Sequence, residues 1–131
     1  MPMPQTRRET PTIFIIEDEP NYRDILVTKF MGEGFRVAIS SDGSDCLEIA
    51  SRINPSVILL DLILPALHGL TILKDLKTDP GTKDVPVIIL SNSDAHHDQT
   101  AGLSLGAEAY LIKSDVGLDE IVLRVKRAAG L

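Results

Sequence analysis

Cysteine is almost missing from this sequence: Cys46 is the single one among 131 residues, which excludes an intrachain disulfide. So few thiols are typical of a reducing compartment, and we expect a cytoplasmic location. Long apolar runs are missing as well, because none comes near the ~18 residues of a membrane-spanning helix. The first residues, MPMPQTRRETP, lack the apolar stretch of a signal peptide, and we interpret residues 1–11 as an extended tail.

Positive charge is in deficit. The chain has 13 Lys and Arg residues against 19 Asp and Glu residues, a formal net charge of −6. Proteins that bind the phosphate backbone need the opposite balance, so we expect no direct contact with nucleic acid. A hydrophobic content of 44% with 24% charged residues is typical of a globular chain. The length fits one domain with its own core, which we assign to residues 12–131.

Five short aliphatic or β-branched segments predict strands. They comprise residues 12–16, 35–40, 56–60, 85–90 and 109–112. The central segments are continuously apolar, as in strands that are buried on both faces of a parallel sheet. Strand and helix patterns alternate five times, and right-handed crossovers then place helices on both faces. The sequence therefore predicts an α/β fold with a doubly wound, five-stranded parallel sheet.

Between these strands, apolar residues recur at helical spacing. The clearest examples are Tyr22, Leu26 and Phe30; Cys46, Ala50 and Ile53; Leu70, Leu73 and Leu76; and the apolar stripe within residues 118–129. Residues 95–105 form the weakest helical pattern, because Gly102 lies inside it and apolar anchors are few. Since negative charge near a helix N-terminus is favourable, we expect Glu19 to cap a helix that begins near Pro20.

Polar residues stand where the predicted strands end. Glu17 and Asp18 follow the first strand, Asp61 the third, Ser91 the fourth and Lys113 the fifth. Because the carboxyl ends of parallel strands meet at one edge, where such sheets hold their sites, these side chains should converge. Two carboxylates ~5 Å apart repel by roughly 3 kcal/mol at an effective dielectric of ~20. Folding does not need that repulsion, whereas a divalent cation would explain it.

The set suits phosphoryl chemistry. Mg²⁺ binds few carboxylates and often bridges to phosphate, which fits Glu17, Asp18 and Asp61. The Ser91 hydroxyl and the Lys113 ammonium can pair with the oxygens of a phosphoryl group on Asp61. Each residue alone has a simpler interpretation, as a cap, a loop residue or a surface cation. Their common placement favours a site.

The motifs IFIIEDE, LLDLILP with Gly69, VIILS and AYLIK resemble those of the receiver domain of two-component response regulators. The resemblance extends from about residue 12 to 129. The spacings agree: 43 residues separate Asp18 from Asp61, 30 separate Asp61 from Ser91, and 52 separate Asp61 from Lys113. The resemblance implies a flavodoxin-like strand order, 2-1-3-4-5.

The resemblance also implies a role for each site residue. Asp61 is the phosphoacceptor; Glu17, Asp18 and Asp61 hold Mg²⁺ together with the backbone carbonyl of Ile63; Ser91 and Tyr110 form the switch; Lys113 is the family's cation. The implied protein is a single-domain, Mg²⁺-dependent response regulator that accepts a phosphoryl group from a histidine kinase or phosphotransfer protein. It is no enzyme beyond its own phosphorylation and dephosphorylation, and it signals to an unknown partner through the last two helices and the last strand.

Five positions depart from the commonest family pattern. Glu17 replaces an aspartate, Ser91 a threonine, His68 an aspartate, Asn92 an alanine and Ser114 a proline. The family proline usually follows a cis bond, but cis costs ~2.5–4 kcal/mol without proline, so we predict a trans bond between Lys113 and Ser114. Ser114 is also a good N-cap for the final helix.

Three other classes compete with this interpretation. A phosphatase of the haloacid dehalogenase type needs a second aspartate two residues after the first, where this chain has Pro20 two residues after Asp18. A flavin-binding module needs a phosphate loop after the first strand, where EDEP would repel phosphate. A receiver that only binds partners would not need the complete acid, hydroxyl and lysine set.

Overall fold

The computed structural model describes residues 10–65 and 67–131, so the predicted extended conformation of residues 1–9 lies outside the described part. Strands and helices alternate along the chain. The strands are β1 (Thr12–Ile16), β2 (Arg36–Ser40), β3 (Val57–Leu60), β4 (Val87–Ser91) and β5 (Ala109–Ile112). The helices are α1 (Pro20–Gly32), α2 (Cys46–Ile53), α3 (Gly69–Thr78), α4 (His96–Ser104) and α5 (Leu118–Ala128).

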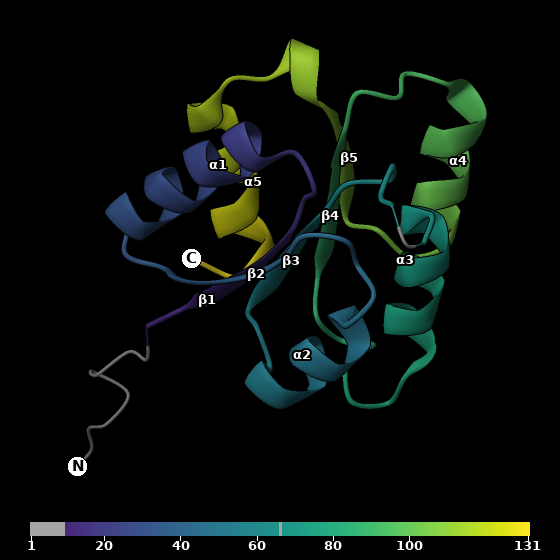
Figure 1. The fold of residues 1–131 in the computed structure, drawn as a ribbon, viewed down its shortest axis with the longest axis horizontal. Coiled ribbons are helices and arrows are strands. Elements are labelled where there is room, and N and C mark those ends of the chain that lie inside the picture. Colours follow the sequence, from purple (N-terminus) through teal and green to yellow (C-terminus); the bar gives the residue numbers. More distant parts are fainter. Residues whose placement is uncertain (1–9, 66) are drawn as a thin grey trace.

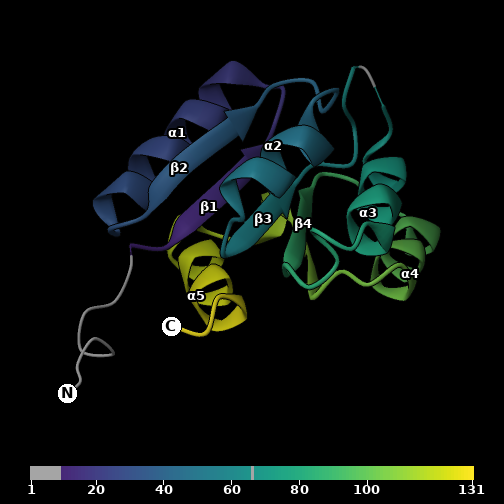
Figure 2. The same ribbon diagram turned by 90° about the horizontal axis from the view of Figure 1, so that it is seen from below.

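The five strands form one parallel sheet in the order β2-β1-β3-β4-β5, which confirms the predicted fold. Helices α1 and α5 cover one face of the sheet, and α2, α3 and α4 cover the other (Figure 1). The view from below shows α3 and α4 together at the right of the molecule, and α5 at the left beside the C-terminus (Figure 2).

Side-chain alternation along β1 divides the core into two clusters. Ile13 and Ile15 pack on the side of α1 and α5, whereas Phe14 and Ile16 pack on the side of α2 and α3. Successive side chains of a strand point to opposite faces, so a strand covered on both sides must be apolar throughout. This explains why the segment TIFII carries no polar residue after its first position.

The register of the sheet aligns the strand ends at one edge. Ile16 pairs with Leu60, and Leu60 pairs with Ile89. Glu17 and Asp61, the residues that follow Ile16 and Leu60, are therefore neighbours. Ser91 pairs with Ile112, which brings Lys113 to the same edge.

Two helix N-termini beside this edge are capped by side chains. Glu19 accepts a hydrogen bond from the Tyr22 backbone N–H, which confirms the predicted cap of α1, and Pro20 occupies the first turn as expected. His68 caps α3, because its Nδ1 accepts from the Leu70 backbone N–H at 3.1 Å. A histidine thus performs the capping that an aspartate would otherwise provide.

The loop after β5 both confirms and corrects the sequence analysis. No cis peptide bond occurs in residues 10–65 and 67–131, so the predicted trans bond between Lys113 and Ser114 is confirmed. The predicted cap by Ser114 is wrong, because Lys113–Asp115 form a 3₁₀ turn and α5 begins only at Leu118. Gly117 occupies the N-cap position and provides no side-chain hydrogen bond.

Candidate functional site

Three carboxylates gather at the carboxyl edge of the sheet. Glu17, Asp18 and Asp61 each place one oxygen so that all three oxygens lie within 4.8 Å of one another. Glu17 and Asp61 are buried, whereas Asp18 is partly exposed. Oxygen ligands at this spacing suit a small, hard cation.

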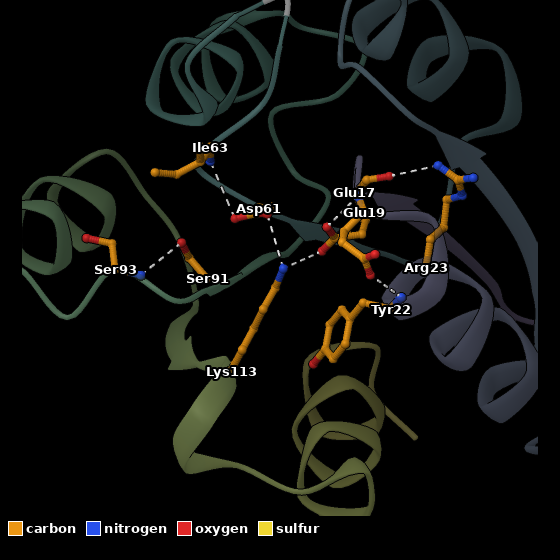
Figure 3. Close-up of polar contacts among 9 residues, drawn as sticks. All are labelled: Glu17, Glu19, Tyr22, Arg23, Asp61, Ile63, Ser91, Ser93 and Lys113. Carbon is orange, nitrogen blue, oxygen red and sulfur yellow. Dashed lines mark hydrogen bonds and ion pairs between the residues drawn. The ribbon is translucent and has the colours of Figure 1, made fainter.

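Lys113 bridges two of these carboxylates. Its Nζ lies 2.7 Å from Oε1 of Glu17 and 3.2 Å from Oδ2 of Asp61 (Figure 3). Burial lowers the pKa of Lys113, but the hydrogen bond to Glu17 and the charges of Asp61 and Glu17 outweigh that effect and raise it overall. The ammonium therefore stays charged and close to Asp61.

For Glu17, burial has a larger effect on the pKa than the contact with Lys113 has. It raises the pKa of the Glu17 carboxyl, and the hydrogen bond from Lys113 offsets only part of the rise. The side chain also accepts from the Glu19 backbone N–H at 3.1 Å. The remaining rise means that one ammonium does not fully stabilise the charge that is concentrated here.

Ser91 connects the site to the following loop. Its side chain is fully buried, and its hydroxyl accepts from the Ser93 backbone N–H at 3.3 Å (Figure 3). The Ser93 hydroxyl donates to Asp98 in the first turn of α4. The Ser93 carbonyl accepts from the Tyr110 hydroxyl at 2.7 Å. Ser93 therefore joins a strand end, a helix and the aromatic residue of β5.

Tyr110 is half-buried in this structure, packed against the core on the side of α2 and α3. Burial raises the pKa of its phenol, and the hydrogen bond to Ser93 works in the opposite direction. The rotation of Tyr110 from an exposed to a buried position, which the resemblance implies, stays a prediction.

The segment after Asp61 lies close to the Asp61 carboxylate and backbone. The Ile63 backbone N–H points at Oδ1 of Asp61 at 3.4 Å, and the Ile63 side chain is 64% exposed beside it. A Cβ on Gly69 would lie 2.4 Å from the carbonyl oxygen of Asp61, so only glycine allows α3 to begin here.

Three features of the site were not predicted from the sequence. The Lys113 ammonium lies over the ring of Tyr22, 4.6 Å from its centroid. Arg23 donates from Nη1 to the backbone carbonyl of Glu17 at 3.3 Å. The third is the role of Ser93. No local pattern marks these residues, although the position of Tyr22 in the first turn after the EDEP segment places it near the site.

The comparisons with known proteins identify the class. The response regulator receiver domain family matches residues 13–126, and the chain belongs to that family. The transcriptional activator protein PfeR of Pseudomonas aeruginosa is 36% identical over 123 residues, covering 89% of this chain and 39% of PfeR. Response regulator PleD of Caulobacter vibrioides is 35% identical over 112 residues, covering 85% of this chain and 24% of PleD.

Two solved structures are similar over nearly the whole chain. The receiver domain of Francisella response regulator 1452 has a TM-score of 0.83 at 30% identity, covering 92% of this chain and 97% of that one. The receiver domain of sensor histidine kinase PA1611 of P. aeruginosa has a TM-score of 0.84 at 25% identity, covering 94% and 100%. That crystal structure holds a magnesium ion in its active-site cleft.

Membership of the family defines what kind of protein this is. Receiver domains are phosphoacceptor signalling domains rather than classical enzymes, and they interact with histidine kinases or phosphotransfer proteins. The chain spans less than half the length of PfeR and of PleD, so the single-domain expectation stays a prediction. Within the described residues, no helix is both long enough and apolar enough to cross a membrane.

Proposed function

We propose that Asp61 is the phosphoacceptor and that the donor is the phosphohistidine of a histidine kinase or phosphotransfer protein. The observation that carries the proposal is the contact of Asp61 Oδ2 with Lys113 Nζ at 3.2 Å, beside two further carboxylates. Asp61 is 7% exposed, so its carboxylate is held firmly but remains in reach of a donor. The lone free cysteine, Cys46, is compatible with the cytoplasmic location that we propose.

In the proposed transfer, a carboxylate oxygen of Asp61 attacks phosphorus. The new O–P bond forms as the N–P bond of the donor breaks, and the imidazole leaves with the electron pair and takes up a proton from solvent. Lys113 and the Ser91 hydroxyl pair with the phosphoryl oxygens as their charge shifts. Such reactions depend mainly on positioning and charge neutralisation, which is what these side chains provide.

Mg²⁺ fits the same site. Glu17, Asp18 and Asp61, with the backbone carbonyl of Ile63, would hold the ion, whose oxygen ligands lie at most about 4.2 Å apart in an octahedral shell. The three carboxylate oxygens lie within 4.8 Å of one another, so small side-chain movements suffice. When bound, Mg²⁺ neutralises charge on the phosphoryl oxygens.

The proposed output surface comprises α4, β5 and α5. Leu103 of α4 and Leu123 of α5 are about half exposed, which suits a protein partner. Phosphorylation would act on this surface through Ser91 and Tyr110, because Tyr110 already contacts the loop that leads into α4. Lys126 of α5 instead turns towards α1, where it pairs with Glu33 at 2.9 Å.

Intact-mass analysis tests the proposal. After incubation with acetyl phosphate and Mg²⁺, the chain should gain the mass of one phosphoryl group, and Asp61→Asn should gain none. Ser44→Ala is a matched control, because the partner of this hydroxyl among the described residues is Asp42 in an exposed loop, and the variant should leave the gain unchanged. A phosphoryl group on Asp61→Asn would place the acceptor elsewhere and contradict the proposal.

A further inference from the structure

The ring of Tyr22 provides a third partner for the Lys113 ammonium. An ammonium has three N–H donors, and two of them meet Glu17 and Asp61. On another side the Tyr22 ring lies 4.6 Å away, within the ~6 Å over which a cation and an aromatic face attract each other. The side chain of Lys113 is only 12% exposed, so little water competes with the ring.

Tyr22 is held in place from two directions. Its backbone N–H is fixed by the Glu19 cap in the first turn of α1, and its half-buried side chain packs against the core cluster under α1 and α5. Figure 3 shows the ring between the α1 and α5 ribbons, with Lys113 approaching from the turn that follows β5. A side chain anchored in this way can restrain a long, flexible lysine.

We propose that Tyr22 is a positioning residue for phosphoryl transfer: its ring keeps the Lys113 ammonium at Asp61 when the carboxylates are occupied by a cation. This inference rests on the proposed function. Glu17 and Asp61 are both the partners of Lys113 and the proposed ligands of Mg²⁺. Of the partners of Lys113 among the described residues, the Tyr22 ring is the one that would not also bind the metal ion.

The ring restrains the Lys113 side chain once a metal ion is bound. When Glu17 turns to a metal ion, the ammonium loses its shortest contact and its four-carbon stem regains rotational freedom. The ring then limits this freedom and leaves the ammonium facing Asp61, where the phosphoryl oxygens would arrive. The Tyr22 hydroxyl plays no part in the attraction, so phenylalanine should replace tyrosine without loss.

Magnetic resonance tests the placement without any phosphorylation. The ε protons of Lys113 should show an upfield ring-current shift in the wild type and in Tyr22→Phe, both without and with Mg²⁺. Tyr22→Leu should lose that shift, and Tyr22→Met is a second ring-free variant should leucine pack badly. A wild-type shift that disappears on adding Mg²⁺ would overturn the inference.

Kinetics test the role. With acetyl phosphate and Mg²⁺, the ring-free variants should be phosphorylated about five- to tenfold more slowly than the wild type, and Tyr22→Phe within about twofold of it. In a Lys113→Met background, removal of the ring should have no further effect, because the ring acts through the ammonium. An equal loss in that background, or in Tyr22→Phe, would overturn the inference.

Val27→Ala is the matched structural control. Val27 also lies on α1 and packs against the same cluster. The contacts of the Lys113 ammonium are made by Glu17, Asp61 and Tyr22. The variant should lower the melting temperature and leave both the shift and the rate unchanged. If the wild type takes up no phosphate, the proposed function is refuted but the inference about Tyr22 is not. The ring-current shift of the Lys113 ε protons still decides whether the ring holds Lys113.

Discussion

At the scale of residues, the site carries more negative charge than positive charge. When all three carboxyls are ionised, Glu17, Asp18 and Asp61 face the single ammonium of Lys113, which leaves two negative charges. Glu17 is paired with Lys113 and hydrogen-bonded to the Glu19 backbone N–H, yet burial still raises the pKa of its carboxyl. A site of this kind favours the arrival of a cation.

Cys46 makes a prediction at the same scale. Burial raises the pKa of its thiol from the ordinary 9.0 to about 12. A raised pKa means that the stability contributed by the neutral thiol is complete below pH 9 and is lost as the pH rises from 9 towards 12. At pH 10 the loss should be about 1.4 kcal/mol.

Cys46→Ala removes this titration and provides the comparison. Urea denaturation at pH 7.5 and pH 10 should show that the wild type loses about 1.4 kcal/mol more than the variant between the two values. Parallel losses in the two proteins would mean that the thiol is not protected by burial. The variant's own loss of packing should be the same at both pH values.

Sequence patterns found the charged residues of the site and missed their aromatic neighbour. Glu17, Asp61 and Lys113 were predictable because each directly follows an apolar strand segment. Tyr22 was predictable only as an apolar residue of a helix. Nothing local indicates that its ring meets the ammonium of Lys113 in the turn after β5, because that contact depends on two side-chain rotamers and on the packing of α1.

At the scale of elements, the sequence predicted strands better than it predicted their flanking turns. The bounds of β1 and β5 are as predicted, but β4 begins at Val87 rather than at residue 85. The Val85 N–H donates to the Thr82 carbonyl in a turn, and Pro86 has no N–H that could donate to a neighbouring strand. Such competition between a turn and a strand is decided by hydrogen bonds that a pattern of apolar residues does not contain.

The close approach of α3 to the strand end supports a matched pair of glycine substitutions. Gly69→Ala would force a Cβ to within 2.4 Å of the Asp61 carbonyl oxygen and 2.5 Å of the Leu62 Cα. Both atoms belong to the backbone and cannot rotate away. We expect the free energy of unfolding to fall by about 3 kcal/mol, the upper end of the usual cost of overpacking.

Gly32→Ala is the control, because no atom lies within 4 Å of the Cβ it would add at the end of α1. Its effect should lie between neutral and about 1 kcal/mol of stabilisation, since alanine favours the helix. Urea denaturation measures both variants. Equal effects at the two positions would show that the backbone at Asp61 can move to accept a side chain.

The loop between β4 and α4 should transmit phosphorylation. If the Ser91 hydroxyl turns to a phosphoryl group on Asp61, its 3.3 Å contact with the Ser93 N–H lengthens. Ser93 also holds Asp98 and Tyr110, so the disturbance reaches α4 and β5 together. We expect the amide resonances of Ser93 and Asp98 to shift on phosphorylation.

Ser91→Ala tests this coupling, because it removes the acceptor for the Ser93 N–H without changing the backbone. Phosphorylation of the variant should shift the Ser93 amide much less than phosphorylation of the wild type. Shifts of the same size in both proteins would contradict a path through the Ser91 hydroxyl. The amide of Thr78, at the far end of α3, serves as the internal reference.

At the scale of the whole molecule, the site and the stability of the fold are linked by mass action. A ligand that binds only the folded chain stabilises it by about 1.4 kcal/mol at ten times its dissociation constant, which is several degrees of melting temperature for a domain of this size. Millimolar Mg²⁺ should therefore raise the melting temperature of the wild type.

Asp18→Asn should lose most of this response to Mg²⁺. Glu17 and Asp61 are each paired with Lys113, whereas Asp18 takes part in none of the ion pairs found within the described residues. Asp18 can therefore bind a cation without giving up an ion pair to Lys113. Asp42→Asn, in an exposed loop, should keep the full response. A wild-type melting temperature that ignores Mg²⁺ would contradict the metal site itself.

The two helices that cover one face of the sheet come from distant parts of the chain. Leu26 and Phe30 of α1 share a core cluster with Ile121 and Val125 of α5. On the ribosome, roughly 90 residues are added between these helices, which takes about 5–20 s at ordinary rates of synthesis. Throughout that interval Leu26 and Phe30 lack the partners that α5 supplies, so we expect a chaperone that binds nascent chains to find them accessible until α5 leaves the exit tunnel.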